Sequence, residues 1–134
     1  MRGAAIAFSE QLEEHYPNVA WDGLIATDMM NLAEFLALTR PRFDRLPILL
    51  YMHENQVGYP LHPDERRDYH YAITNFISIL SASKVVFNSE YNRKEFFSGI
   101  RSIFAQMPDC RPAPEMLDST EASSEVIPPA IELH

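Results

Sequence analysis

The hydrophobic run from Pro47 to Met52 limits the fold more than any other part of the chain. Its residues are continuously apolar and favour β-structure, and its proline stands at the first position, where a strand tolerates it. Shorter runs of the same kind, at residues 24–27 and 84–88, alternate with stretches of helical periodicity. Such alternation predicts an α/β fold: a parallel sheet with helices on both faces, which right-handed crossovers make Rossmann-like.

The remaining elements follow from capping residues and breakers. Helices are expected at residues 4–15, 30–39, 65–81 with Asp64 as N-cap, and from the N-cap Ser89 to about residue 106. A last short strand is expected at residues 125–127. The expected order of elements begins with a helix that no strand precedes, and it ends on a strand after which nothing packs. This order predicts an incomplete Rossmann-like unit. A sheet that lacks its first strand exposes an unpaired edge, so self-association is also expected.

Composition restricts the class of protein. The 134 residues allow one domain, and 46% hydrophobic content is enough for a packed core. No apolar run reaches the roughly 18 residues that a membrane span needs, so no contact with a membrane is expected. The acidic start does not resemble a signal peptide, and the single Cys110 has no partner for a disulfide. These features predict a reducing, cytoplasmic location.

The net charge of -8 argues against binding of nucleic acid through bulk electrostatics. The acidic residues are concentrated after residue 108, and residues 109–124, rich in proline, serine and carboxylates, are predicted to form a mobile loop. Basic residues cluster elsewhere in the chain. They either form a local basic surface or, as is more common for such clusters, are solvated residues at helix ends and in loops. The clusters include Arg40, Arg42 and Arg45, and then Arg66 and Arg67.

Polar residues follow three of the expected strands at the point where each strand ends. They are Thr27-Asp28, the four residues from His53 to Gln56, and Asn88-Ser89. In an open parallel sheet, ligands bind at the carboxyl ends of the strands, so these groups should share one edge. The sequence therefore predicts a ligand site there, and the alternative is that the polar groups satisfy strand-end backbone and cap the next turn.

The residues from His53 to Gln56 have the chemistry of a site. A neutral imidazole can move a proton, and Glu54 can accept hydrogen bonds from a polyol or act as a base. Asn55 and Gln56 each offer donors and acceptors, as sugar and base edges require. The spacing of His53 to the other histidines fits no compact zinc pattern, so no metal site is expected.

Three further residues have two interpretations each. Asp28 either caps the following helix, the favoured interpretation, or points into the cleft. Ser89 is expected to be an N-cap, and the free N–H groups at that helix end could also hold a phosphate. Tyr59 could stack on a sugar or base, although half-buried packing is the commoner role. The chain has no GxGxxG or GxxxxGK[ST] motif, so it is expected to supply half of a site rather than a complete nucleotide site.

Several of these motifs together resemble a known family. They are Thr27-Asp28-Met29, Tyr51-Met52-His53-Glu54-Asn55-Gln56, Tyr59-Pro60, Arg67-Asp68 with Tyr71, and Phe87-Asn88-Ser89. The chain is similar, over most of residues 1–108, to the N-terminal domain of the tRNA-queuosine alpha-mannosyltransferases, which are related to the GT-B glycosyltransferases. Residues 126–129 resemble the strand that precedes the interdomain linker of that family.

The resemblance implies a two-lobed enzyme with a cleft between Rossmann-like lobes. Residues 1–108 would be the acceptor lobe without its first strand, followed by the loop at 109–124 and by the last strand and start of a linker at 125–134. The second lobe, absent from this chain, would hold the donor GDP-mannose, so this fragment alone is expected to be inactive. The resemblance implies no bound metal or cofactor.

The resemblance also implies roles for individual residues. His53 and Glu54 would be catalytic, and the acceptor would be a cyclopentenediol hydroxyl of queuosine in a tRNA anticodon. Contacts to the sugar or acceptor would come from Asp28, Asn55, Gln56, Tyr59, Asn88 and Ser89, and contacts to tRNA from Arg40, Arg42, Arg45, Arg66 and Arg67. Two alternatives are a GT-B lobe for a glycan or lipid acceptor, and a flavodoxin-like binding module without catalysis.

Overall fold

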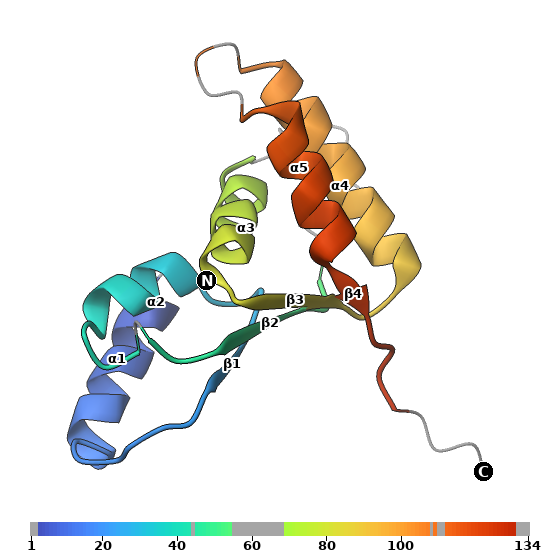
Figure 1. Ribbon diagram of the computed structural model, residues 1–134. Coiled ribbons are helices and arrows are strands. Elements are labelled where there is room, and N and C mark those ends of the chain that lie inside the picture. Colours follow the sequence, from blue (N-terminus) through green and yellow to red (C-terminus); the bar gives the residue numbers. More distant parts are fainter. Residues whose placement is uncertain (1–2, 44, 55–68, 108, 110–111, 131–134) are drawn as a thin grey trace, which may run out of the picture.

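The computed structural model describes residues 3–43, 45–54, 69–107, 109 and 112–130. Among these residues, four strands form one parallel sheet in the order β1-β2-β3-β4, accompanied by five helices (Figure 1). The elements are α1 (Ala4–His15), β1 (Leu24–Thr27), α2 (Leu32–Leu38), β2 (Ile48–Met52), α3 (His70–Ser81), β3 (Lys84–Phe87), α4 (Glu90–Ala105), α5 (Pro114–Ser123) and β4 (Glu125–Val126). The predicted α/β, Rossmann-like class is confirmed. None of the described helices is both long and apolar enough to cross a membrane.

Side-chain caps determine where two of the helices begin. The Oδ1 atom of Asn31 accepts a hydrogen bond from the backbone N–H of Glu34 (3.1 Å) at the start of α2. The Oγ atom of Ser89 accepts one from the backbone N–H of Asn92 (3.1 Å) at the start of α4. Each bond satisfies a donor that the first turn of a helix otherwise leaves unpaired. The predicted N-cap role of Ser89 is confirmed, and the predicted cap Asp64 lies outside the described residues.

The hydrophobic core lies between the helices and one face of the sheet. Register places Ala26 beside Leu50 and Leu50 beside Val85, so these three side chains point to the same face. All three are buried, together with apolar side chains of the helices. Helix α4 contributes five buried apolar side chains, namely Phe96, Phe97, Ile100, Ile103 and Phe104.

The opposite face of the sheet is not covered by the described helices. It carries Ile25, Leu49 and Tyr51 on neighbouring strands, and the Ile25 side chain is 76% exposed. The five helices lie together on the other side (Figure 1). Within the described residues, the predicted parallel sheet is therefore covered by helices on one of its two faces. The strands lie in the sheet in the same order as along the chain. Because every crossover then runs in the same direction, right-handed crossovers place their helices on the same side of the sheet.

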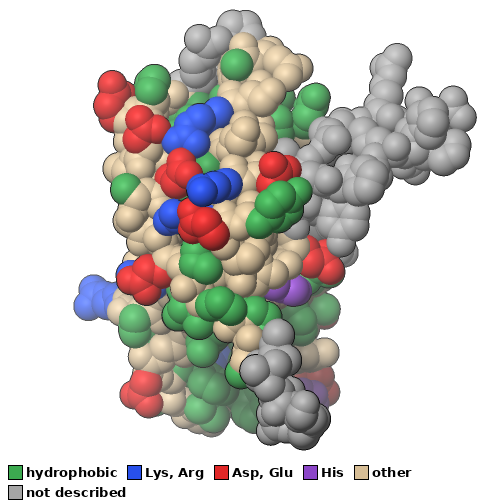
Figure 2. All heavy atoms as spheres, turned by 90° about the vertical axis from the view of Figure 1, so that its right-hand side faces the viewer, with side chains coloured by type: hydrophobic (Ala, Val, Ile, Leu, Met, Phe, Trp, Pro, Cys, Tyr) green, Lys and Arg blue, Asp and Glu red, His purple; other side chains and the backbone are tan. Residues whose placement is uncertain are grey.

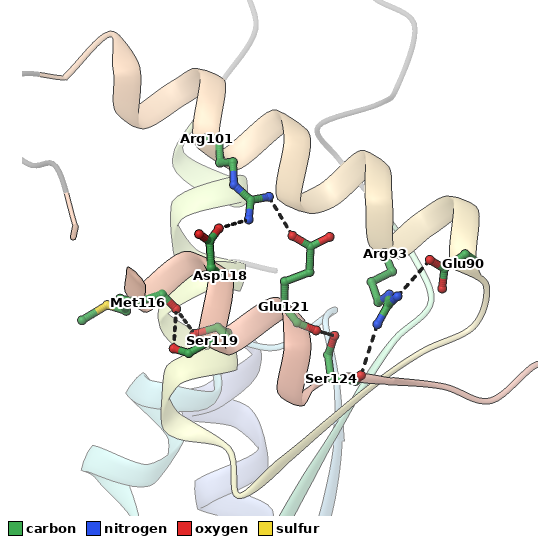
Figure 3. Close-up of polar contacts among 9 residues, drawn as sticks. Glu90, Arg93, Arg101, Met116, Asp118, Ser119, Glu121 and Ser124 are labelled. Carbon is green, nitrogen blue, oxygen red and sulfur yellow. Dashed lines mark hydrogen bonds and ion pairs between the residues drawn. The ribbon is translucent and has the colours of Figure 1, made fainter. Parts of the chain in front are cut away.

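Helix α5 occupies residues for which the sequence predicts a loop. Pro114 stands in its first turn, where the missing N–H costs nothing. It packs on α4 through Leu117 and through Arg101, whose guanidinium nitrogens lie 2.7 Å from Asp118 and 2.8 Å from Glu121 (Figure 3). The loop prediction for residues 109–124 is wrong over this helix. Leu117 is the one buried side chain of α5. A helix with a single buried side chain has no apolar periodicity in its sequence, and this is why the pattern did not predict it.

Candidate functional site

The carboxyl ends of β1 and β2 bring Asp28 and His53 into contact. The two strands are neighbours in the sheet, and each of these residues follows the last residues of its strand. The Nδ1 atom of His53 lies 2.6 Å from the Oδ1 atom of Asp28. The Asp28 side chain is 1% exposed, whereas that of His53 is 36% exposed. The pair therefore has a buried acidic member and an imidazole that reaches the surface of the carboxyl edge.

Asp28 is held in place by a second contact. Its Oδ2 atom accepts a hydrogen bond from the backbone N–H of Glu54 (2.8 Å). Burial raises the pKa of Asp28 above its ordinary value, an effect opposed by the N–H of Glu54 and by the charge of His53. A proton on Nδ1 would lie toward this carboxylate, and Nε2 would then be the imidazole nitrogen available to a ligand. An imidazole in this state can take a proton from a bound hydroxyl.

The favoured prediction that Asp28 caps the next helix is wrong. Asn31 caps α2, and the Asp28 carboxylate instead contacts the residues after β2. The reason lies in the sheet, because β2 runs beside β1 and places His53 and Glu54 next to Asp28. The alternative interpretation, in which Asp28 points into the cleft, stays a prediction, and the structure shows its buried side chain in contact with His53.

Asn88 and Asn92 support the same edge from β3 and α4. The Nδ2 atom of Asn88 donates to the backbone oxygen of His53 (3.0 Å). The Nδ2 atom of Asn92 donates to the backbone oxygen of Met52 (3.2 Å) and to Oδ1 of Asn88 (2.8 Å). These bonds fix the backbone at the end of β2, where the imidazole begins. Asn88 thus contacts the backbone of His53 and not its imidazole. The side chain of Ser89 caps α4.

Asn92 is a residue of the site region that the sequence reasoning missed. It is buried in the first turn of α4, on the side that faces the end of β2. A polar amide at a buried helical position was the available signal, since such groups are buried only with hydrogen-bond partners. Asn55, Gln56, Tyr59, Arg66 and Arg67, five other predicted site residues, lie outside the described residues.

The basic cluster at Arg40, Arg42 and Arg45 lies away from this edge. These residues belong to the connection that leads from α2 into β2, and such a connection reaches the amino ends of the strands. The Arg42 guanidinium lies 3.4 Å from Glu13 and donates to the backbone oxygen of Tyr16. Arg42 therefore joins the end of α1 to this connection, while Arg40 and Arg45 are exposed. The structure does not bring the cluster to the Asp28–His53 pair.

Figure 2 views the molecule from the side on which the strands end. Charged side chains of both signs gather on its upper part, over the helices α4 and α5, and hydrophobic side chains gather lower down. Among the described residues, no three histidine, cysteine or carboxylate side chains come together as ligands for a metal ion. The Asp28–His53 pair provides groups at this edge that can donate and accept hydrogen bonds.

Comparison with known proteins agrees with the resemblance of the motifs. The family described as tRNA-queuosine alpha-mannosyltransferase N-terminal matches residues 1–131. The chain is 31% identical over 108 residues to the tRNA-queuosine alpha-mannosyltransferase of Drosophila melanogaster, a match that covers 81% of this chain and 28% of that protein. No solved structure matches the chain significantly. The chain thus spans less than a third of its curated relative, and it belongs to the tRNA-queuosine alpha-mannosyltransferase family, whose N-terminal part it matches.

Proposed function

We propose that this chain is the acceptor-side lobe of a glycosyltransferase of the GT-B type, which transfers mannose from GDP-mannose to queuosine in a tRNA anticodon. The family membership supports the reaction class, and the relative from Drosophila is named as a tRNA-queuosine alpha-mannosyltransferase. The observation that carries the proposal is the 2.6 Å contact between Asp28 and His53 at the carboxyl edge of the sheet. In the proposal the donor is bound by a second lobe, and the enzyme works in the cytoplasm, where tRNA is found.

Glycosyl transfer breaks the bond between the anomeric carbon and the diphosphate and joins that carbon to a hydroxyl oxygen of the acceptor. The hydroxyl proton must leave as the new bond forms. In our proposal Nε2 of His53 takes this proton, while Asp28 holds Nδ1–H and stabilises the imidazolium that results. The diphosphate leaves with its negative charge, which cationic groups outside this chain would neutralise.

The supporting residues have roles in this scheme that follow from their contacts. Asn88 and Asn92 keep the backbone of Met52 and His53 in place, so the imidazole does not move when the acceptor binds. Glu54 contributes its backbone N–H to Asp28 in the structure, and the catalytic part proposed for its side chain rests on the resemblance. Asn55, Gln56 and Tyr59 are proposed to bind the sugar or acceptor on the same basis.

A transfer assay with paired variants tests the proposal. In the complete enzyme that carries this lobe, His53→Ala should lower mannose transfer to queuosine-containing tRNA by about 10²- to 10⁴-fold, the usual effect of a positioned proton-transfer group. His15→Ala is the matched control, because that exposed histidine lies at the far end of α1. Equal transfer by the folded His53→Ala variant would remove His53 from the reaction. Since no step is assigned to a bound metal, transfer should continue in the presence of EDTA.

A further inference from the structure

Tyr51 lies on the face of the sheet that the described helices leave open. It stands in β2 in register with Val86 of β3 and shares its face with Ile25 of β1. Val86 is only 2% exposed although it does not belong to the core beneath the helices. The Tyr51 hydroxyl donates to the backbone oxygen of Ile127 (3.3 Å), which follows β4 on the far side of β3. The tyrosine ring therefore crosses β3 and covers Val86.

The same ring stands beside the imidazole of His53. The two rings are stacked nearly parallel, with an angle of 13° between their planes and 6.3 Å between their centroids. Residues two apart in a strand direction point to the same face, which explains why Tyr51 and His53 meet. Parallel, offset rings at this separation attract one another. His53 thus has a carboxylate at Nδ1 and an aromatic ring along its face.

Ile127 marks the point where the chain leaves the sheet. Its backbone N–H donates to the backbone oxygen of Phe87 (2.9 Å), and its backbone oxygen accepts from Tyr51. Pro128 and Pro129 follow, and neither has an N–H that could continue the ladder with β3. The tyrosine hydroxyl therefore connects the imidazole with the start of the exit segment, which we define as residues 127–129.

We propose that Tyr51 is a positioning residue for His53 and that it links the orientation of the imidazole to the exit segment. The proposal rests on the proposed function of His53 as the group that takes the acceptor proton. The ring of Tyr51 limits rotation of the imidazole about its side-chain bonds, and the hydroxyl anchors that ring to the backbone of Ile127. Removal of the hydroxyl and removal of the ring should therefore have different effects.

Two variants separate these effects. Tyr51→Phe keeps the aromatic ring and loses the bond to Ile127, whereas Tyr51→Leu loses both; Tyr51→Val, which suits a strand, serves if the leucine variant does not fold. Tyr91→Phe is the matched control, because this tyrosine of α4 is 74% exposed. The 134-residue chain is labelled with ¹⁵N-histidine for NMR, and His53→Gln identifies the resonances of His53.

The expected result has two parts. In Tyr51→Leu the ring protons of His53 should lose the shift caused by the stacked ring, and the ¹⁵N shifts should move from a single tautomer toward an average. In Tyr51→Phe the His53 signals should stay close to those of the parent chain, but exchange of the Ile127 amide with solvent should accelerate about tenfold or more. The control Tyr91→Phe should change neither the imidazole signals nor the amide exchange.

Two results would overturn the inference. Unchanged His53 proton and ¹⁵N shifts in a folded Tyr51→Leu or Tyr51→Val variant would show that the tyrosine does not position the imidazole. Unchanged exchange of the Ile127 amide in Tyr51→Phe would show that the exit segment is not linked to it. These measurements use no substrate, so their outcome is independent of the transfer assay. If both proposals hold, Tyr51→Leu should also lower kcat by roughly tenfold, while Tyr51→Phe retains it.

Discussion

Asp28 and His53 come from different strands, yet they hold one another at the carboxyl edge of the sheet with Oδ1 and Nδ1 2.6 Å apart. The carboxylate is buried and also accepts the backbone N–H of Glu54, so it is part of the frame of the site. The imidazole extends from this frame to the surface. Function and stability should therefore respond differently when either member of the pair is changed.

The first prediction concerns the dependence of stability on pH. Burial raises the pKa of Asp28, so the folded protein binds this proton more tightly than the unfolded chain does. The contribution of Asp28 to stability is therefore greatest below the ordinary aspartate pKa and declines as the pH rises toward the raised value. Asp28→Asn removes this decline, so its Tm relative to the parent chain should increase from about pH 4 to pH 7. Melting curves across this range would measure the difference, and a difference that shrinks with pH would contradict the prediction.

Asp28→Asn should also separate stability from activity. The amide cannot stabilise an imidazolium as a carboxylate does, so transfer in the complete enzyme should fall by about 10²-fold or more even where Tm is unchanged or higher. Transfer rates and melting curves from the same preparations would test this. A stable variant with parental transfer would show that the carboxylate has no part in the reaction.

The third prediction concerns Asn92, whose amide nitrogen bonds to the backbone oxygen of Met52 and to Asn88. Asn92→Ala removes both bonds in a buried place and should lower the free energy of unfolding by about 1 to 3 kcal/mol. Chemical denaturation would measure the change. Ser102→Ala, an exposed substitution on the same helix, is the control and should change the stability little.

The fourth prediction concerns binding of tRNA through the exposed arginines of the α2–β2 connection. If Arg40 and Arg45 each touch a phosphate, replacing both with alanine should reduce the slope of log binding constant against log salt by up to about two. Lys84→Ala with Lys94→Ala removes the same charge elsewhere and serves as the control. Arg42 stays in place, because it holds the backbone at the end of α1. An equal slope in both double variants would place the tRNA contact elsewhere.

The fifth prediction concerns self-association, which the sequence analysis expects from an unpaired sheet edge. In the described part of the chain β1 pairs with β2 alone, and Ile25 of β1 is largely exposed. If this edge brings copies together, Ile25→Lys should lower the association seen in sedimentation, since an edge lysine opposes strand pairing. Met116→Lys adds the same charge on α5 and should leave the association unchanged. A parent chain that stays monomeric over a wide range of concentration would refute the expectation.

The sequence by itself determined the four strands, the helices other than α5, and the edge of the sheet where polar groups follow the strands. The continuous apolar run before His53 and the cap at Ser89 act over a few residues, and short-range forces are readable along the chain. Because strands of a parallel sheet end at one edge, the polar groups after β1, β2 and β3 were also predictable as neighbours. The resemblance to the family was recognised from the same motifs, and the comparisons confirm the family.

Tertiary structure decided which of these groups touch and which surfaces remain open. Asp28 turned from an expected helix cap into the partner of His53 because β2 lies beside β1, and Asn92 entered the site region because α4 starts next to the end of β2. Helix α3 shows the same limit, since its apolar side chains are divided: Phe76 is buried while Ile77 and Leu80 are exposed. The side of a helix that meets the core depends on strand order and crossover hand. Both are long-range properties that no local pattern of residues contains.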